Sequence, residues 1–202
     1  KRNGAEIKEK KKKDKWFVIV DGEKQKKYDF ITPYSIVISP DCNRIVYCAA
    51  KDKKLFVVEG NKEYDSGDRI EKNSILFSSD SKSLLFIFRK LNKYYLFMNG
   101  KISKPYDFIE SDSVKFSFDS KHVVFIARDK DKKSVILDFK IIGSYDSILS
   151  KNPESSSMGM NTRSSMMSKK PEKKEKFYFS KDGNLLFFAL KNQKLYKVIK
   201  KI

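Results

Sequence analysis

The chain has 202 residues, of which 44 are Lys or Arg and 26 are Asp or Glu, so its formal net charge is +18. No apolar run approaches the roughly 20 residues of a membrane-spanning helix, and no signal-peptide pattern is present, which excludes an integral helical membrane protein. The composition predicts a soluble protein of the cytoplasm or periplasm, large enough for one domain and attractive to polyanions.

The first fifteen residues are predicted to be a basic N-terminal segment, 1–15, outside the core. They hold eight Lys or Arg against three acidic residues. An apolar strand, WFVIVDG, begins at Trp16, and the four letters Tyr28-Asp29-Phe30-Ile31 close a first partial unit, 16–31.

The rest of the chain repeats at an interval of 39 residues. The residues that define the repeat are Tyr28, Tyr106, Tyr145, Ile31, Ile70, Ile109, Ile148, Asp41, Asp80, Asp119 and Asp182. Asp182 is displaced by 24 further residues, which correspond to a Ser-, Met- and Lys-rich stretch at 152–175 that is predicted to be an inserted mobile loop.

Each unit contains a strand ending in Ser-x-Asp, a tight turn, two further apolar strands and a polar stretch that ends in Tyr-Asp and Ile. This order predicts a four-stranded antiparallel meander. Three units are complete, at 34–70, 73–109 and 112–148, and a partial one covers 177–202. The Tyr-Asp-x-Ile motif is interpreted as the outer strand of each unit.

The middle strands are apolar on consecutive residues, as in RIVYCAA, SLLFIF, HVVFIA and NLLFFA. A strand that is covered on both faces has no need to alternate apolar and polar residues, so the sheets are predicted to stack on one another. We therefore expect an all-β fold, a β-propeller or a fragment of one built from four-stranded blades. An aromatic residue six positions after each turn Asp is predicted to pack between blades: Tyr47, Phe86, Phe125 and Phe188.

The Ser-Pro-Asp-x-x-x-Ile-Val-Tyr pattern at 39–47, its copies at Ser78, Ser117 and Ser180, and the pieces WFVIVDG and YDFI resemble the WD40-like, TolB-type propeller repeats of bacterial proteins. The resemblance covers nearly all of the chain except the insertion and the first dozen residues. It implies a propeller that serves as a partner platform or as an accessory domain of a peptidase. The Trp-Asp and Gly-His pairs of true WD40 repeats are absent.

Three arrangements of the blades fit the sequence. The two partial units could combine into a closed four-bladed ring, the chain could be a fragment of a larger propeller, or it could be an open arc whose edges pair with another copy. The sequence favours a fragment or an open arc.

No enzyme motif is present, and no cofactor or metal is predicted. His122 is the single histidine and has no second ligand nearby, so it is interpreted as a residue at the start of a strand. Cys42 and Cys48 are interpreted as free thiols. Four aspartates that recur once per unit are favoured as structural residues over a shared cation site: Asp29, Asp65, Asp107 and Asp146.

The loops between the second and third strands are basic, and we expect them to share one face with the unit-to-unit connections, the insertion among them. The candidate partner-binding residues are Lys51, Lys53, Lys54, Arg89, Lys90, Lys93, Arg128, Lys130, Lys132, Lys133, Lys191 and Lys194. Lysines that keep a β-rich protein soluble are an equally weighted explanation.

The sequence thus favours a non-enzymatic interaction module that binds an acidic protein. The alternative is an accessory propeller of a hydrolase whose catalytic domain lies elsewhere. Nucleic acid is less favoured, because the aromatic residues lie inside strands instead of between the basic loops.

Overall fold

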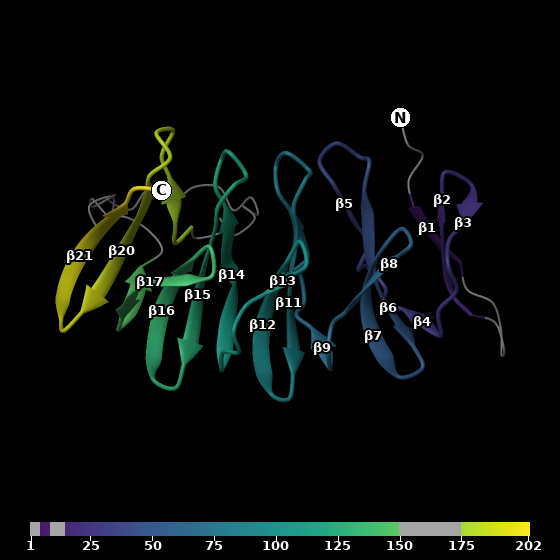
Figure 1. The fold of residues 1–202 in the computed structure, drawn as a ribbon, viewed down its shortest axis with the longest axis horizontal. Coiled ribbons are helices and arrows are strands. Elements are labelled where there is room, and N and C mark those ends of the chain that lie inside the picture. Colours follow the sequence, from purple (N-terminus) through teal and green to yellow (C-terminus); the bar gives the residue numbers. More distant parts are fainter. Residues whose placement is uncertain (1–4, 9–14, 150–174) are drawn as a thin grey trace, which may run out of the picture.

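The structure, a computed structural model, describes residues 5–8, 15–149 and 175–202. Within these residues the fold is all-β, and five antiparallel sheets stand side by side in a row (Figure 1). No described helix has the length and apolar character needed to cross a membrane.

The first two sheets come from residues 5–65. The first contains β1 (Ala5–Lys8), β2 (Phe17–Val20) and β3 (Glu23–Lys24). The second contains β4 (Phe30–Ile31), β5 (Val37–Ile38), β6 (Ile45–Lys51), β7 (Lys54–Glu59) and β8 (Lys62–Asp65), and both β4 and β5 pair with β6.

The other three sheets repeat this order. The third has β10 (Leu76–Phe77), β11 (Leu84–Lys90), β12 (Lys93–Met98) and β13 (Lys101–Ile102), with β9 (Arg69–Ile70) beside β11. The fourth has β14 (Phe108–Phe116), β15 (Val123–Asp129), β16 (Lys132–Leu137) and β17 (Lys140–Tyr145). The fifth has β18 (Ser147–Leu149), β19 (Tyr178–Phe179), β20 (Leu185–Lys191) and β21 (Lys194–Lys200).

The core consists of four apolar clusters, one between each pair of neighbouring sheets. In β6, Val46 and Cys48 contact the third sheet while Tyr47 and Ala49 contact the first. Because successive side chains of a strand point to opposite faces, a continuous apolar run supplies two clusters at once. The predicted all-β stack of sheets with covered middle strands is confirmed.

The Tyr-Asp-x-Ile motif connects two sheets, so its interpretation as an outer strand was wrong. Tyr28 forms an isolated bridge with Trp16 of the first sheet, whereas Ile31 pairs with Ala49 of β6 in the second. In the second occurrence the tyrosine bridges to β12 and the isoleucine pairs with β15. The motif recurs because each crossover makes the same pair of contacts, and its tyrosines and isoleucines are buried or half-buried.

The aromatic position that follows the turn shifts by one residue in the fifth sheet. The turn that starts at Ser117 closes five residues later, whereas the turn that starts at Ser180 closes four residues later. A change of one residue moves every following side chain to the other face. Phe187, which is 1% exposed, therefore packs against the fourth sheet, and Phe188, which the sequence placed there, lies on the opposite face.

The predicted insertion, 152–175, lies outside the described residues apart from Glu175. The strands on either side of it, β18 and β19, both pair with β20. It therefore interrupts the first strand of the fifth sheet and does not join two sheets, contrary to the expectation that placed it with the basic loops. Of the predicted segment 1–15, the structure describes β1, which pairs with β2, and Lys15.

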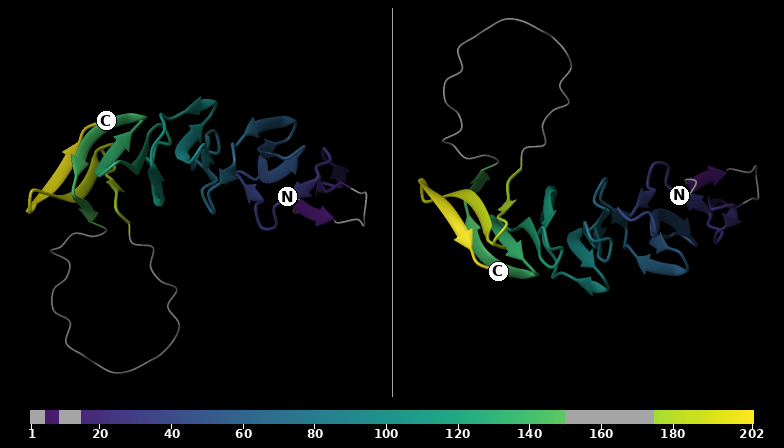
Figure 2. Two further views of the ribbon diagram at one scale, coloured as in Figure 1. Left: turned by 90° about the horizontal axis from the view of Figure 1, so that it is seen from below. Right: turned by 90° about the horizontal axis from the view of Figure 1, so that it is seen from above.

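The described sheets form an open arc. Views along the other axis place the first and fifth sheets at opposite ends of the row (Figure 2). The closed four-bladed ring, one of the three arrangements derived from the sequence, is therefore not the arrangement of these sheets.

Candidate functional site

The basic loops are four tight hairpin turns along one edge of the arc, at the lower side of Figure 1. In the turn after β6, Asp52 and Lys53 have φ values of 51° and 62°, and the turns after β11 and β20 likewise have positive φ at both central residues. Two-residue turns of this kind match the twist of antiparallel strands, so each tip is held in a defined position.

An aspartate at the crossover into each sheet caps the hairpin turn of that sheet. Its carboxylate accepts the turn's backbone N–H at 2.6–2.8 Å: Asp29 from Asp52, Asp68 from Leu91, Asp107 from Lys130 and Asp146 from Asn192. The N–H of Asp52 holds the pKa of Asp29 below its usual value. Asp65, which the sequence placed in this set, accepts from the Gly67 N–H at 2.9 Å instead.

Several of the candidate basic residues make contacts within the chain. Lys93 pairs with Asp107, and the Lys133 Nζ lies 2.9 Å from Glu110 Oε1. The guanidinium groups of Arg89 and Arg128 lie over the rings of Tyr94 and Phe108, and Lys51 is half-buried. The exposed candidates are Lys53, Lys54, Lys90, Arg128, Lys130, Lys132, Lys191 and Lys194.

The edge carries a net positive charge. Its four turns hold the twelve candidate Lys and Arg residues and three aspartates, and the capping aspartates bring the acidic total to seven. An excess of five positive charges remains. The capping carboxylates thus remove part of the charge that the loop sequences suggest, while leaving the exposed lysines at the tips.

The opposite edge is formed by the Ser-x-Asp turns. The hydroxyl groups of Ser39, Ser78 and Ser117 donate to Asp41, Asp80 and Asp119 at 2.5–2.6 Å, and each carboxylate also accepts a backbone N–H two residues later. The serine hydroxyl is the main cause that lowers the pKa of each of these aspartates. Asp182 lies in the shorter turn of the fifth sheet.

Three serines use their hydroxyl groups in place of backbone hydrogen-bonding groups in the sheets. The sequence reasoning missed them. Ser35, Ser74 and Ser113 stand where the first strand breaks, and each hydroxyl accepts an N–H from the second strand at 2.9–3.1 Å. Each also donates to a carbonyl three residues earlier. Their interval of 39 residues was the signal that could have identified them.

His122 and the two cysteines make no catalytic arrangement among the described residues. The Nδ1 of His122 lies 2.6 Å from Asp138 Oδ2, and Asp138 also accepts the Val123 N–H. Cys42 and Cys48 are free, and burial raises the pKa of the Cys48 thiol to about 11, so it stays protonated at neutral pH. No described group of His, Cys, Asp and Glu could hold a metal ion.

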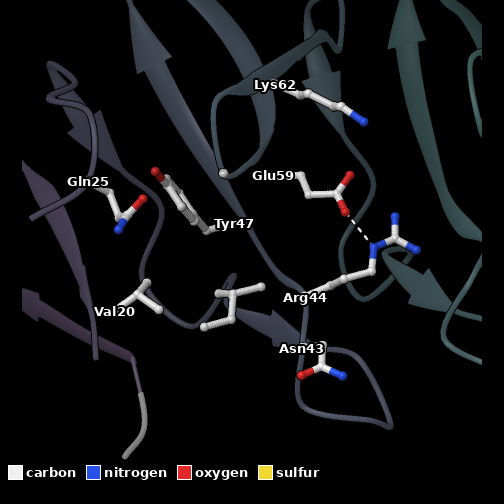
Figure 3. Close-up of a pocket in the computed structure, with 9 residues that line it drawn as sticks. Val20, Gln25, Asn43, Arg44, Tyr47, Glu59 and Lys62 are labelled. Carbon is white, nitrogen blue, oxygen red and sulfur yellow. Dashed lines mark hydrogen bonds and ion pairs between the residues drawn. The ribbon is translucent and has the colours of Figure 1, made fainter. Parts of the chain in front are cut away.

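A cavity of about 270 Å³ opens between the first and second sheets, on the edge opposite the basic hairpins (Figure 3). Gln25 and Val20 line it from the first sheet, and Tyr47 stands between them and Glu59 of the second. Glu59 accepts from Arg44 Nε at 2.5 Å and from the Tyr64 hydroxyl at 3.0 Å.

No protein-family model matches the chain, and no curated protein matches it. Among solved structures, TolB from Acinetobacter baumannii superposes with a TM-score of 0.39 and 12% identity, over 93% of this chain and 46% of TolB. A prolyl endopeptidase gives a TM-score of 0.38 and 12% identity, over 100% of this chain and 40% of that protein. The chain spans less than half the length of either, and its fold assignment rests on its own strand pairing and stacked cores.

Proposed function

We propose that the protein is a non-enzymatic β-propeller-type scaffold whose basic hairpin edge binds an acidic protein. The observation that supports this function is the set of four turns on one edge, each held by a capping aspartate and each ending in exposed lysines. Rigid turns lose little conformational freedom when a partner binds, and an excess of positive charge steers an acidic surface towards them.

An acidic protein is favoured over nucleic acid because few aromatic rings near the edge are exposed: Phe30 and Tyr196 are 43% and 42% exposed, and Tyr94 and Phe108 are engaged in packing. Tyr94 and Phe108 stack edge-on at 5.2 Å and lie beneath the guanidinium groups of the two hairpin arginines. The fully exposed Tyr34 and the largely exposed Phe118 lie in loops away from the hairpin tips. Binding of single-stranded nucleic acid uses aromatic side chains that are free to stack on bases.

The test compares two charge-matched variants of the full chain. One changes Lys53, Lys90, Lys130 and Lys194 to Gln, one residue in each hairpin. The control changes four exposed lysines of the opposite edge to Gln: Lys82, Lys121, Lys140 and Lys181. Both variants lose four charges, so a difference between them reports position and not net charge.

The probe is a polyglutamate peptide, with duplex DNA as a second ligand, and binding is measured at several salt concentrations. We expect the hairpin variant to bind polyglutamate at least about fivefold more weakly than the control variant, because four exposed ion pairs contribute roughly 0.2–1 kcal/mol each. Equal weakening in the two variants would refute a binding edge. If the protein bound DNA more tightly than polyglutamate, and the hairpin variant lost this binding, the inferred partner would be nucleic acid and not an acidic protein.

We also propose that a second copy of the chain covers the outer face of the fifth sheet, against which no other described sheet packs. Leu195 and Ile199 are 50% and 59% exposed, and they pair across the sheet with Leu190 and Leu186 on one face. In the second, third and fourth sheets the face that looks towards the next sheet is covered by that sheet. The native mass should rise with concentration, and Ile199→Glu should abolish the rise; a mass that stays monomeric throughout would exclude the pairing.

A further inference from the structure

The hydroxyl of Tyr47 is buried and has no hydrogen-bond partner among the described residues. Its side chain is 2% exposed. The hydroxyl of the neighbouring Tyr28 donates to Glu63 Oε1 at 2.8 Å. A buried hydroxyl without a partner costs about 1–3 kcal/mol, so its retention needs a reason.

The chain itself provides the residue that would avoid this cost. The positions equivalent to Tyr47 in the third, fourth and fifth sheets are Phe86, Phe125 and Phe187, each 0–1% exposed and each directed towards the preceding sheet. Phenylalanine therefore satisfies the packing between sheets. The hydroxyl is an addition, and it occurs at an interface where this position lines a cavity of about 270 Å³.

Among the groups that line the cavity, Arg44 and Glu59 are fully engaged in hydrogen bonds, whereas the Tyr47 hydroxyl and the Gln25 amide are not. Both oxygens of Glu59 accept hydrogen bonds, from Arg44 and from Tyr64. Gln25 Nε2 makes a single long contact of 3.4 Å with the Glu23 carbonyl. The Tyr47 hydroxyl and Gln25 Nε2 can both donate to a ligand that accepts hydrogen bonds.

The charge of the cavity is positive. Arg44 and Glu59 neutralise one another, whereas Lys62 has no ion-pair partner among the described residues. Figure 3 shows Lys62 on the side of the cavity opposite Gln25. An acceptor that carries negative charge suits this arrangement better than a neutral one.

We propose that this cavity binds a small carboxylate-bearing molecule. The carboxylate accepts hydrogen bonds from the Tyr47 hydroxyl and Gln25 Nε2, Lys62 supplies the opposite charge, and the apolar part of the ligand packs on Val20 and Ile45. The volume suits a small molecule, since drug-sized ligands occupy cavities of about 300–1,000 Å³. The site lies on the edge opposite the basic hairpins and does not depend on the function proposed for them.

The experiment titrates the full chain with acetate, succinate and glutarate and follows backbone amide resonances by NMR at constant ionic strength. We expect saturable shifts at Gly60 and Lys62. Tyr47→Phe should weaken binding about 10- to 150-fold, the value of one hydrogen bond to a charged group. Lys62→Met should weaken it about 2- to 5-fold, and the matched control Lys140→Met, which removes a lysine outside the cavity, should leave it unchanged.

Each other outcome counts against the proposal. Chloride that produces the same shifts would show a general salt effect, and the absence of saturable binding for all three acids would overturn the site. An affinity for the acids that is unchanged in Tyr47→Phe would show that the Tyr47 hydroxyl does not bind the ligand. Glucose that binds in place of the acids, with loss in Tyr47→Phe, would refute the carboxylate class. The hairpin variants serve as a further control, because their binding of these acids should equal that of the unaltered chain.

Discussion

Replacement of Tyr47 by phenylalanine should stabilise the protein in the absence of ligand. The change removes a hydroxyl that has no partner and keeps the ring, whose place in the other interfaces is taken by phenylalanine. An unsatisfied buried polar group costs about 1–3 kcal/mol, so the free energy of unfolding should rise by roughly that amount. For a chain of this length, each kcal/mol corresponds to about 2–4 °C in Tm.

Urea denaturation is the assay, because a shift of the midpoint at constant slope reports a change in stability without a change in the surface exposed. Burial raises the pKa of Tyr47 to about 12, so the hydroxyl is neutral throughout the range of such measurements and its protonation does not complicate them.

The converse substitution, Phe86→Tyr, adds a hydroxyl at the equivalent position of the third sheet. Phe86 stacks on Phe97 with ring centroids 4.5 Å apart and is fully buried, so a hydroxyl added there should lower stability. A loss of stability of more than about 0.5 kcal/mol in Tyr47→Phe, measured without ligand, would refute the reasoning, since substitutions that remove no favourable interaction usually change stability by less than that. It would mean that the hydroxyl makes a favourable interaction in the unliganded protein.

Three further predictions concern the fold. Ser74→Ala should lower stability by about 1–3 kcal/mol, because the Ile87 N–H that its hydroxyl accepts is left unpaired in the core, and denaturation against the unaltered chain measures it. Phe187→Ala should lower the free energy of unfolding by about 3–5 kcal/mol, and Phe188→Ala should lower it clearly less. The reverse order would contradict the register of β20. Burial alone would raise the pKa of Glu110, but the two lysine ammonium groups beside it outweigh burial and lower the pKa. The ionised Glu110 therefore stabilises the fold above its unfolded pKa of about 4.3, and this stabilisation is lost as the pH falls through the lower pKa of the folded state. Glu110→Gln should lower the free energy of unfolding at neutral pH, and the difference from the unaltered chain should shrink in acid.

The basic residues show what a local sequence pattern can predict and what it cannot. The sequence identified the four hairpins, because Lys, Asp and Asn between apolar runs are turn signals. It treated their twelve basic residues alike. Lys93 and Lys133 are engaged by Asp107 and Glu110, which lie at no common interval from them in the sequence and meet them only when neighbouring strands and sheets pack.

The cavity was beyond sequence reasoning for a related reason. Tyr47 was recognised as one of four aromatic residues in equivalent positions, and a tyrosine among phenylalanines is an ordinary substitution in a buried strand. Only the position of Gln25, Glu59 and the Tyr28 hydroxyl around it reveals that its own hydroxyl lacks a partner. Hydrogen-bond satisfaction depends on distances of a few tenths of an ångström, which composition and spacing do not carry.

The sequence by itself determined that the chain forms strands apolar on both faces, and hence that sheets of one design stack with their middle strands covered. That follows from the alternation of side chains along a strand and needs no knowledge of partners. The tertiary structure alone decided that Tyr-Asp-x-Ile joins two sheets, that Phe187 and not Phe188 enters the core, and that the stack is an open arc. Each of these depends on which strands pair and in which register, and a difference of a single residue in one turn is enough to exchange the two faces of a strand.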